Sequence, residues 1–149
     1  LGLLDPALLM YESAMQLGLR YEDEWLRWRS ELGIGVLHQA RGNYPSARRS
    51  FGLVLSAPTA HPELLLAAHQ GLVSAAIAAK DYSTALRHGW AMLEYADDRS
   101  ATKAEVLCVL GGLCTEIGCP SAAVGAFSVA LSLSEHTHQR WFLLRETLT

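Results

Sequence analysis

The side chains best suited to chemistry in this 149-residue chain are three cysteines and six histidines. Cys108, Cys114 and Cys119 lie close together, and His136 and His138 form an H-x-H pair. Such groups could bind zinc, but zinc sites usually space their ligands as Cys-x-x-Cys or His-x-x-x-His. Neither spacing occurs in this sequence. We therefore expect no metal site and no cofactor, and we expect the odd number of cysteines to be reduced thiols.

Catalytic motifs are also absent from the sequence. There is no Gly-x-Ser-x-Gly turn, no phosphate-binding loop and no His-Glu-x-x-His pair. Five acidic residues gather at the expected ends of helices, where they favour the helix dipole or a solvated loop: Glu22, Asp23, Glu24, Asp97 and Asp98. We expect the protein not to be an enzyme.

Composition and charge exclude several other classes. Half of the residues are hydrophobic and 18% are charged, which suits a packed core rather than disorder. The net charge is −3, and the densest basic cluster (Arg41, Arg48 and Arg49) is too small for a nucleic-acid surface. No apolar stretch approaches the roughly 18 to 20 residues of a membrane span. We expect a cytoplasmic protein that binds neither nucleic acid nor membrane. Because the chain starts at Leu1 rather than at methionine, we also expect it to be part of a longer protein.

The strongest pattern is an internal repeat with a period of about 38 residues, and a fixed period of about 20 to 50 residues is typical of repeat architectures. A shorter, partial repeat near the start of the chain aligns Ala7 with Ala47 and Tyr11 with Phe51. The equivalent positions of the three full units are Ile34, Leu72 and Leu110; Gly35, Val73 and Gly111; Ala47, Ala85 and Ala123; Phe51, Gly89 and Phe127; Leu55, Leu93 and Leu131.

Each unit of the repeat has the pattern of two helices joined by a short turn. Apolar residues recur at helical spacing, and no segment shows the alternation of a strand. A short turn makes the two helices antiparallel neighbours, so small residues are expected where they cross. We expect Ala123 to face Gly111, and Phe51 and Phe127 to fill the wedges between successive pairs. The expected helices cover about 23–41 and 45–55, 62–79 and 83–95, and 102–117 and 121–134.

The repeat resembles the tetratricopeptide repeat (TPR) family, in which a leucine-glycine pair in the first helix precedes a glycine turn and an alanine and phenylalanine in the second helix. The third unit carries the closest match, and the first unit is nearly as close. The family's usual period is about 34 residues, so we assign the extra residues to longer first helices. The residues that carry the resemblance are Leu110, Gly111, Cys114, Gly118, Ala123, Phe127 and Ala130, and then Ile34, Gly35, Gly42, Tyr44, Ala47 and Phe51.

These observations predict an all-α fold, an α-solenoid of antiparallel helix pairs that forms a TPR-like superhelix. We expect one repeat domain over residues 1–149. It would comprise a half repeat (3–17), repeats at about 23–58, 59–97 and 100–135, and a terminal helix at 139–148.

The resemblance also implies a concave groove lined by the first helices. Ordinary helix surface or partial core is the alternative interpretation of each groove position. The positions that it implies are Arg29, Leu32, Val36, Gln39, Gln70, Ser74, Ile77, Glu105, Cys108 and Thr115.

The resemblance implies a scaffold that binds a protein or peptide in this groove without catalysis. The alternative hypothesis is a regulatory or sensor segment of a larger signalling protein or transcription regulator, which binds a small effector or signalling peptide. A homo-oligomer through the ends of the array is a further possibility. The segment from Ser121 to Ser134 has no charged residue, and Trp141, Phe142 and Leu144 supply an apolar surface after it that we expect to be an interface.

Overall fold

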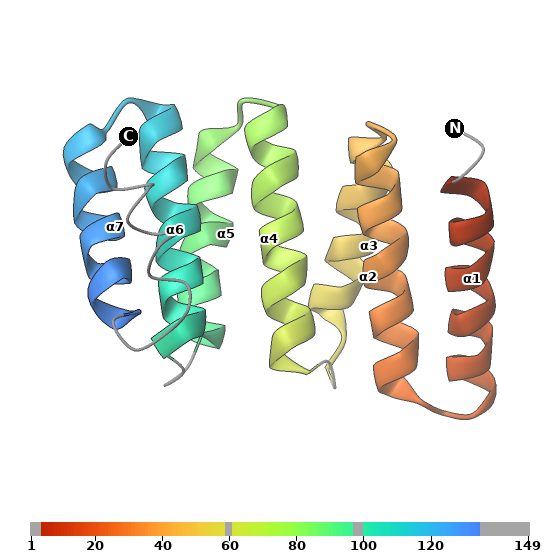
Figure 1. The fold of residues 1–149 in the computed structure, drawn as a ribbon. Helices are drawn as coiled ribbons and strands as arrows, with labels where there is room; N and C mark the ends of the chain where they lie inside the picture. Colours follow the sequence, from red (N-terminus) through yellow and green to blue (C-terminus); the bar gives the residue numbers. More distant parts are fainter. Residues whose placement is uncertain (1–3, 59–60, 97–99, 135–149) are drawn as a thin grey trace. The chain divides into compact units, whose positions relative to one another are not determined.

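A computed structural model of the chain describes residues 4–58, 61–96 and 100–134, and all of its regular structure is α-helical (Figure 1). The prediction of an all-α fold is therefore confirmed for these residues. The expected terminal helix at 139–148 lies outside the described residues, as do Trp141, Phe142 and Leu144. The helices are α1 (Leu4–Arg20), α2 (Glu24–Ala40), α3 (Tyr44–Ser56), α4 (Pro62–Ala78), α5 (Tyr82–Tyr95), α6 (Ser100–Ile117) and α7 (Pro120–Leu133).

Polar side chains start three of these helices. The Asp23 carboxylate accepts a hydrogen bond from the Leu26 backbone N–H at 2.9 Å, which caps α2. The Asn43 and Asp81 side chains cap α3 and α5 in the same way. Such a cap satisfies a backbone donor that has no partner within the helix. Asn43 and Asp81 are equivalent positions of successive units, so the same device recurs at the period of the repeat.

The turns between helices recur at the same period. Gly42, Lys80 and Gly118 are equivalent positions of the three units, and their φ angles are +75°, +57° and +84°. A residue in this left-handed region ends a helix and reverses the chain. Glycine adopts it without strain, whereas lysine does so at a cost. The turn geometry is therefore repeated even where its glycine is not.

The chain divides into two compact units, Leu1–Ala79 with α1 to α4 and Lys80–Thr149 with α5 to α7. In the first unit, α2 packs against α1 and α3, and α4 packs against α3 and α2. Successive helices of this unit run in opposite directions (Figure 1). In the second unit, α6 packs against both α5 and α7. The predicted middle repeat would combine α4 of one unit with α5 of the other, and it stays a prediction.

The core of the first unit is centred on α3. The Phe51 and Val54 side chains are fully buried there, and the partly buried Trp28 of α2 packs against the same cluster. This core removes the apolar faces of three helices from water, which is the main favourable term in their packing. Its buried members are Leu32, Ala47, Phe51, Val54, Leu64, Ala68 and Leu72.

Aromatic rings lie against glycines at several close approaches between helices. A Cβ atom built on Gly35 would be 2.7 Å from the Phe51 ring, and one on Gly71 would be 2.5 Å from it. Phe51 therefore fills the space between α2 and α4 in this unit, as the sequence predicted. In the second unit, the atoms nearest to a Cβ on Gly111 belong to Phe127, at 2.7 Å. The expectation that Ala123 faces Gly111 across this helix pair stays a prediction.

A candidate binding groove between α2 and α4

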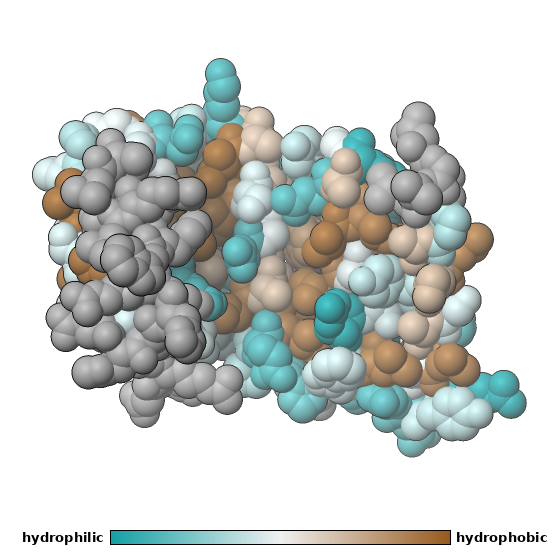
Figure 2. All heavy atoms as spheres, in the orientation of Figure 1, coloured by the Kyte–Doolittle hydropathy of each residue, from teal (hydrophilic) through white to brown (hydrophobic). Residues whose placement is uncertain are grey.

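An open groove of about 550 Å³ lies between α2 and α4 in the first unit. Figure 2 shows apolar residues interspersed among hydrophilic ones over the helices of this unit. No charged side chain lines the groove, although charged residues are common elsewhere on α2 and α3. The lining residues are Val36, Gln39, Ala40, Tyr44, Ala67, Gln70, Gly71 and Ser74.

The polar groups of the groove are neutral donors and acceptors. The Gln39 and Gln70 amides can each donate and accept hydrogen bonds. The Ser74 hydroxyl donates to the backbone carbonyl of Gln70 at 3.2 Å, which leaves the hydroxyl oxygen able to accept. Val36 supplies an apolar surface, with 55% of its area exposed. The groove can therefore hold a neutral polar chain with small apolar groups.

One lining residue of the groove, Gly71, also contacts the core. Gly71 is half-buried, and its backbone lies directly on the Phe51 ring. A side chain at this position would collide with the ring. Gly71 was not among the predicted groove residues. The repeat could have indicated it, because Gly33 is the equivalent position of the preceding unit and contacts the Tyr11 ring in the same way.

The structure brings together four of the predicted groove residues: Val36, Gln39, Gln70 and Ser74. Leu32 does not line this groove: its side chain is only 6% exposed and belongs to the core cluster that contains Phe51. The remaining two from this unit, Arg29 and Ile77, do not line the groove. Arg29 is exposed on α2, and Ile77 is half-buried on α4.

The other three predicted residues lie on α6 in the second unit. Glu105 and Thr115 are exposed, and Cys108 is half-buried. The Thr115 hydroxyl donates to the backbone carbonyl of Gly111 at 3.0 Å, as β-hydroxyl side chains often do inside helices. The place of these residues in a binding groove stays a prediction.

The three cysteines and several other side chains able to bind metal lie among the described residues. No three His, Cys, Asp or Glu side chains are grouped there in a way that could hold a metal ion. Cys108, Cys114 and Cys119 are not disulfide-bonded, and Cys119 is exposed. His136 and His138 lie outside the described part of the chain. No described helix combines the length and apolar character needed to cross a bilayer.

Comparison with known proteins assigns no family: no family model matches the chain, and no curated protein is similar to it. The repeats within the chain can be compared with one another. All three share a left-handed turn residue at the same place, and the first and third also share a phenylalanine ring packed on glycine.

Proposed function

We propose that this chain is a helical-repeat scaffold of the TPR type, and that the groove between α2 and α4 binds a segment of a protein partner. The observation that carries the proposal is the neutral lining of this groove, at positions that the repeat pattern places on the first helices. The proposal includes no catalytic step.

Three repeated features support a solenoid of antiparallel helix pairs. The left-handed turn residues recur at 42, 80 and 118, and polar caps follow the first two of these turns at Asn43 and Asp81. The third feature is the packing of Phe51 and Phe127 on glycines of the preceding helix. One helix pair cannot bury its own apolar face, so pairs with this pattern stack on one another. Stacked pairs present their first helices on one concave surface.

The groove suits an extended peptide better than a small effector. Sites for small ligands usually bury most of the ligand surface, whereas this groove is open along its length. The Gln39 and Gln70 amides can pair with the N–H and C=O groups of a peptide backbone. Because the lining has no charge, we expect binding to depend little on salt concentration.

The test is a selection of peptides on the purified chain from a phage-displayed random library. Binding of the synthetic peptides is then measured by fluorescence anisotropy. Val36→Glu and Ser74→Arg should each weaken binding roughly tenfold or more, since a charge placed in a neutral groove must be desolvated by the ligand. Arg48→Glu adds the same glutamate at an exposed position of α3 outside the groove, and it should bind normally. Selected peptides that bind all three variants equally would show that this groove is not the site.

A further inference from the structure

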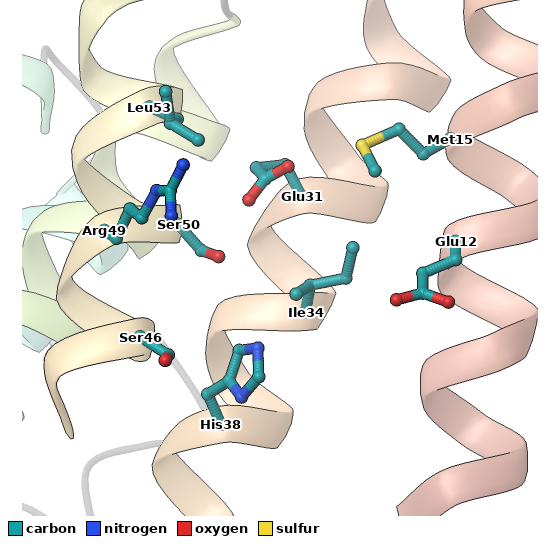
Figure 3. A pocket seen from close by; sticks show the side chains of 9 residues that line it. All are labelled: Glu12, Met15, Glu31, Ile34, His38, Ser46, Arg49, Ser50 and Leu53. Atoms are coloured by element: carbon teal, nitrogen blue, oxygen red, sulfur yellow. The ribbon is translucent and has the colours of Figure 1, made fainter. Parts of the chain in front are cut away.

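A second groove, of about 440 Å³, lies in the same unit and is formed by α1, α2 and α3 (Figure 3). It shares no residue with the groove between α2 and α4. Its lining residues are Glu12, Met15, Glu31, Ile34, His38, Ser46, Arg49, Ser50 and Leu53.

The two grooves lie on opposite sides of α2. Ile34 lines the second groove and Val36 lines the first, two residues further along the helix. Two residues correspond to a rotation of about 200° around an α-helix. A ligand in one groove therefore leaves the other accessible.

The second groove differs from the first because it is charged. Figure 3 shows the Glu12 side chain on the wall formed by α1, Glu31 between the walls on α2, and Arg49 on the opposite wall formed by α3. Within the described part of the chain, no hydrogen bond or ion pair joins any of these three side chains to another residue. The groove thus presents two carboxylates and one guanidinium that are available to a ligand.

Apolar side chains form the floor and rim between these charges. Ile34 is only 7% exposed at the floor, and Leu53 is 44% exposed at the rim. Glu31 is half-buried beside this apolar surface. A charge pair formed there is less screened than one in open water, so a cation next to Glu31 would be bound more strongly than at an exposed carboxylate.

We propose that the second groove docks a peptide segment of a partner protein through a lysine or arginine side chain. Its cationic end lies against Glu12 and Glu31, and its aliphatic stem covers Ile34, because long basic side chains pack their methylene groups on apolar surface. An acidic residue of the same segment faces Arg49 across the groove. Charge complementarity selects this occupant, since the carboxylates outnumber the guanidinium. This inference is independent of the proposed function of the first groove.

Such a site would give α2 two different partners at once. The first groove offers neutral hydrogen-bonding groups, and the second offers fixed charges, so each selects a different kind of segment. A chain with both grooves occupied holds its two partners on opposite sides of one helix.

The experiment selects a phage-displayed random peptide library on the Ser74→Arg variant, in which the first groove carries a positive charge that does not attract basic peptides. We expect the enriched peptides to contain lysine or arginine, and their affinity to fall as salt concentration rises. Glu31→Lys should weaken binding roughly tenfold or more, and the milder Glu31→Gln should weaken it by less. A peptide whose basic residue is replaced by glutamate should recover affinity for Glu31→Lys.

The matched control is Glu63→Lys, which makes the same change at an exposed position of α4 that lines neither groove. It should bind the peptides normally, and circular dichroism establishes that every variant is folded. Three results would overturn the proposal: no enrichment of basic peptides, equal affinity for Glu31→Lys and the Ser74→Arg parent, or no recovery with the charge-reversed peptide. Because the first groove is already altered in the selection, a failure here does not bear on the function proposed for it.

Discussion

Gly71 on α4 lies directly against the aromatic ring of Phe51 on α3, so that a Cβ atom on Gly71 would come within 2.5 Å of Phe51 Cε2. The other edge of the same ring meets Gly35 on α2, at 2.7 Å from the position of its Cβ. Phe51 has no exposed surface. The ring therefore sets the approach of α2 to α4, and with it the width of the groove that these helices line.

Replacing Gly71 with alanine should destabilise the chain by about 1–3 kcal/mol, because the added methyl group overpacks a buried ring. Gly52 on α3 is the matched control, since nothing lies within 4 Å of a Cβ built there. Gly52→Ala should stabilise the helix by about 0.5–1 kcal/mol, the usual gain of alanine over glycine. Urea unfolding of both variants measures the two effects. Equal stability of the two variants would contradict the contact with Phe51.

The next repeat indicates which substitution would make room for alanine at position 71. The position equivalent to Phe51 is held there by Gly89, and the position equivalent to Gly71 is held by Val109. We therefore expect Gly71→Ala to cost less in a Phe51→Leu background than in the natural chain. A double-mutant cycle measures the difference, and residues in direct contact usually show a coupling of about 0.5–3 kcal/mol. Additive effects of the two substitutions would argue against a shared space.

Helix boundaries were largely predictable, for local reasons. The α2 and α4 helices begin within one residue of their predicted starts, because Asp23 can cap a helix and Pro62 suits a first turn. The turn at Gly42 was equally clear. These features act over a few residues, so the sequence contains all that is needed to recognise them.

The groove could be predicted only in part, because its shape depends on small rotations of whole helices. Leu32 and Val36 are four residues apart, which places them about 40° apart around α2. That angle is enough to bury Leu32 in the core and to leave Val36 at the groove. The second groove was not predicted at all, since it joins Glu12, Glu31 and Arg49 from three helices and no short motif contains them.

Lys80 occupies a turn position that glycine fills in the other two repeats. Its φ angle of +57° is in the left-handed region, which costs a residue with a side chain about 1–2 kcal/mol. Lys80→Gly should therefore stabilise the chain by up to about 1 kcal/mol, after allowing for the greater flexibility of glycine in the unfolded state. Gly118→Ala makes the opposite change at the equivalent turn and should destabilise it. Thermal unfolding compares the two; a loss of stability in Lys80→Gly would show that its side chain has another role.

Ala123 lies in the closely packed part of α7 and is only 4% exposed. Ala123→Leu should overpack this helix against its neighbour and cost about 1–3 kcal/mol. The neighbouring Ala122 is exposed, so Ala122→Leu makes the same chemical change where there is room for it. That control should alter the free energy of unfolding by no more than about 0.5 kcal/mol. A melting curve unchanged in Ala123→Leu would show that the side of α7 that carries Ala123 is not packed closely.

His88 on α5 should make stability depend on pH. Its burial, and then the nearby Arg87 guanidinium, lower the pKa of the imidazole from its ordinary value of 6.5. The folded chain therefore holds this imidazole neutral at pH values where the unfolded chain is protonated. As the pH falls through 6.5, the unfolded state takes up the proton first, so the free energy of unfolding should fall.

Urea unfolding above and below pH 6.5 measures this change. His88→Gln should flatten it, and Arg87→Gln should reduce it in part because only the burial remains. If His88→Gln keeps the full pH dependence, another group is responsible.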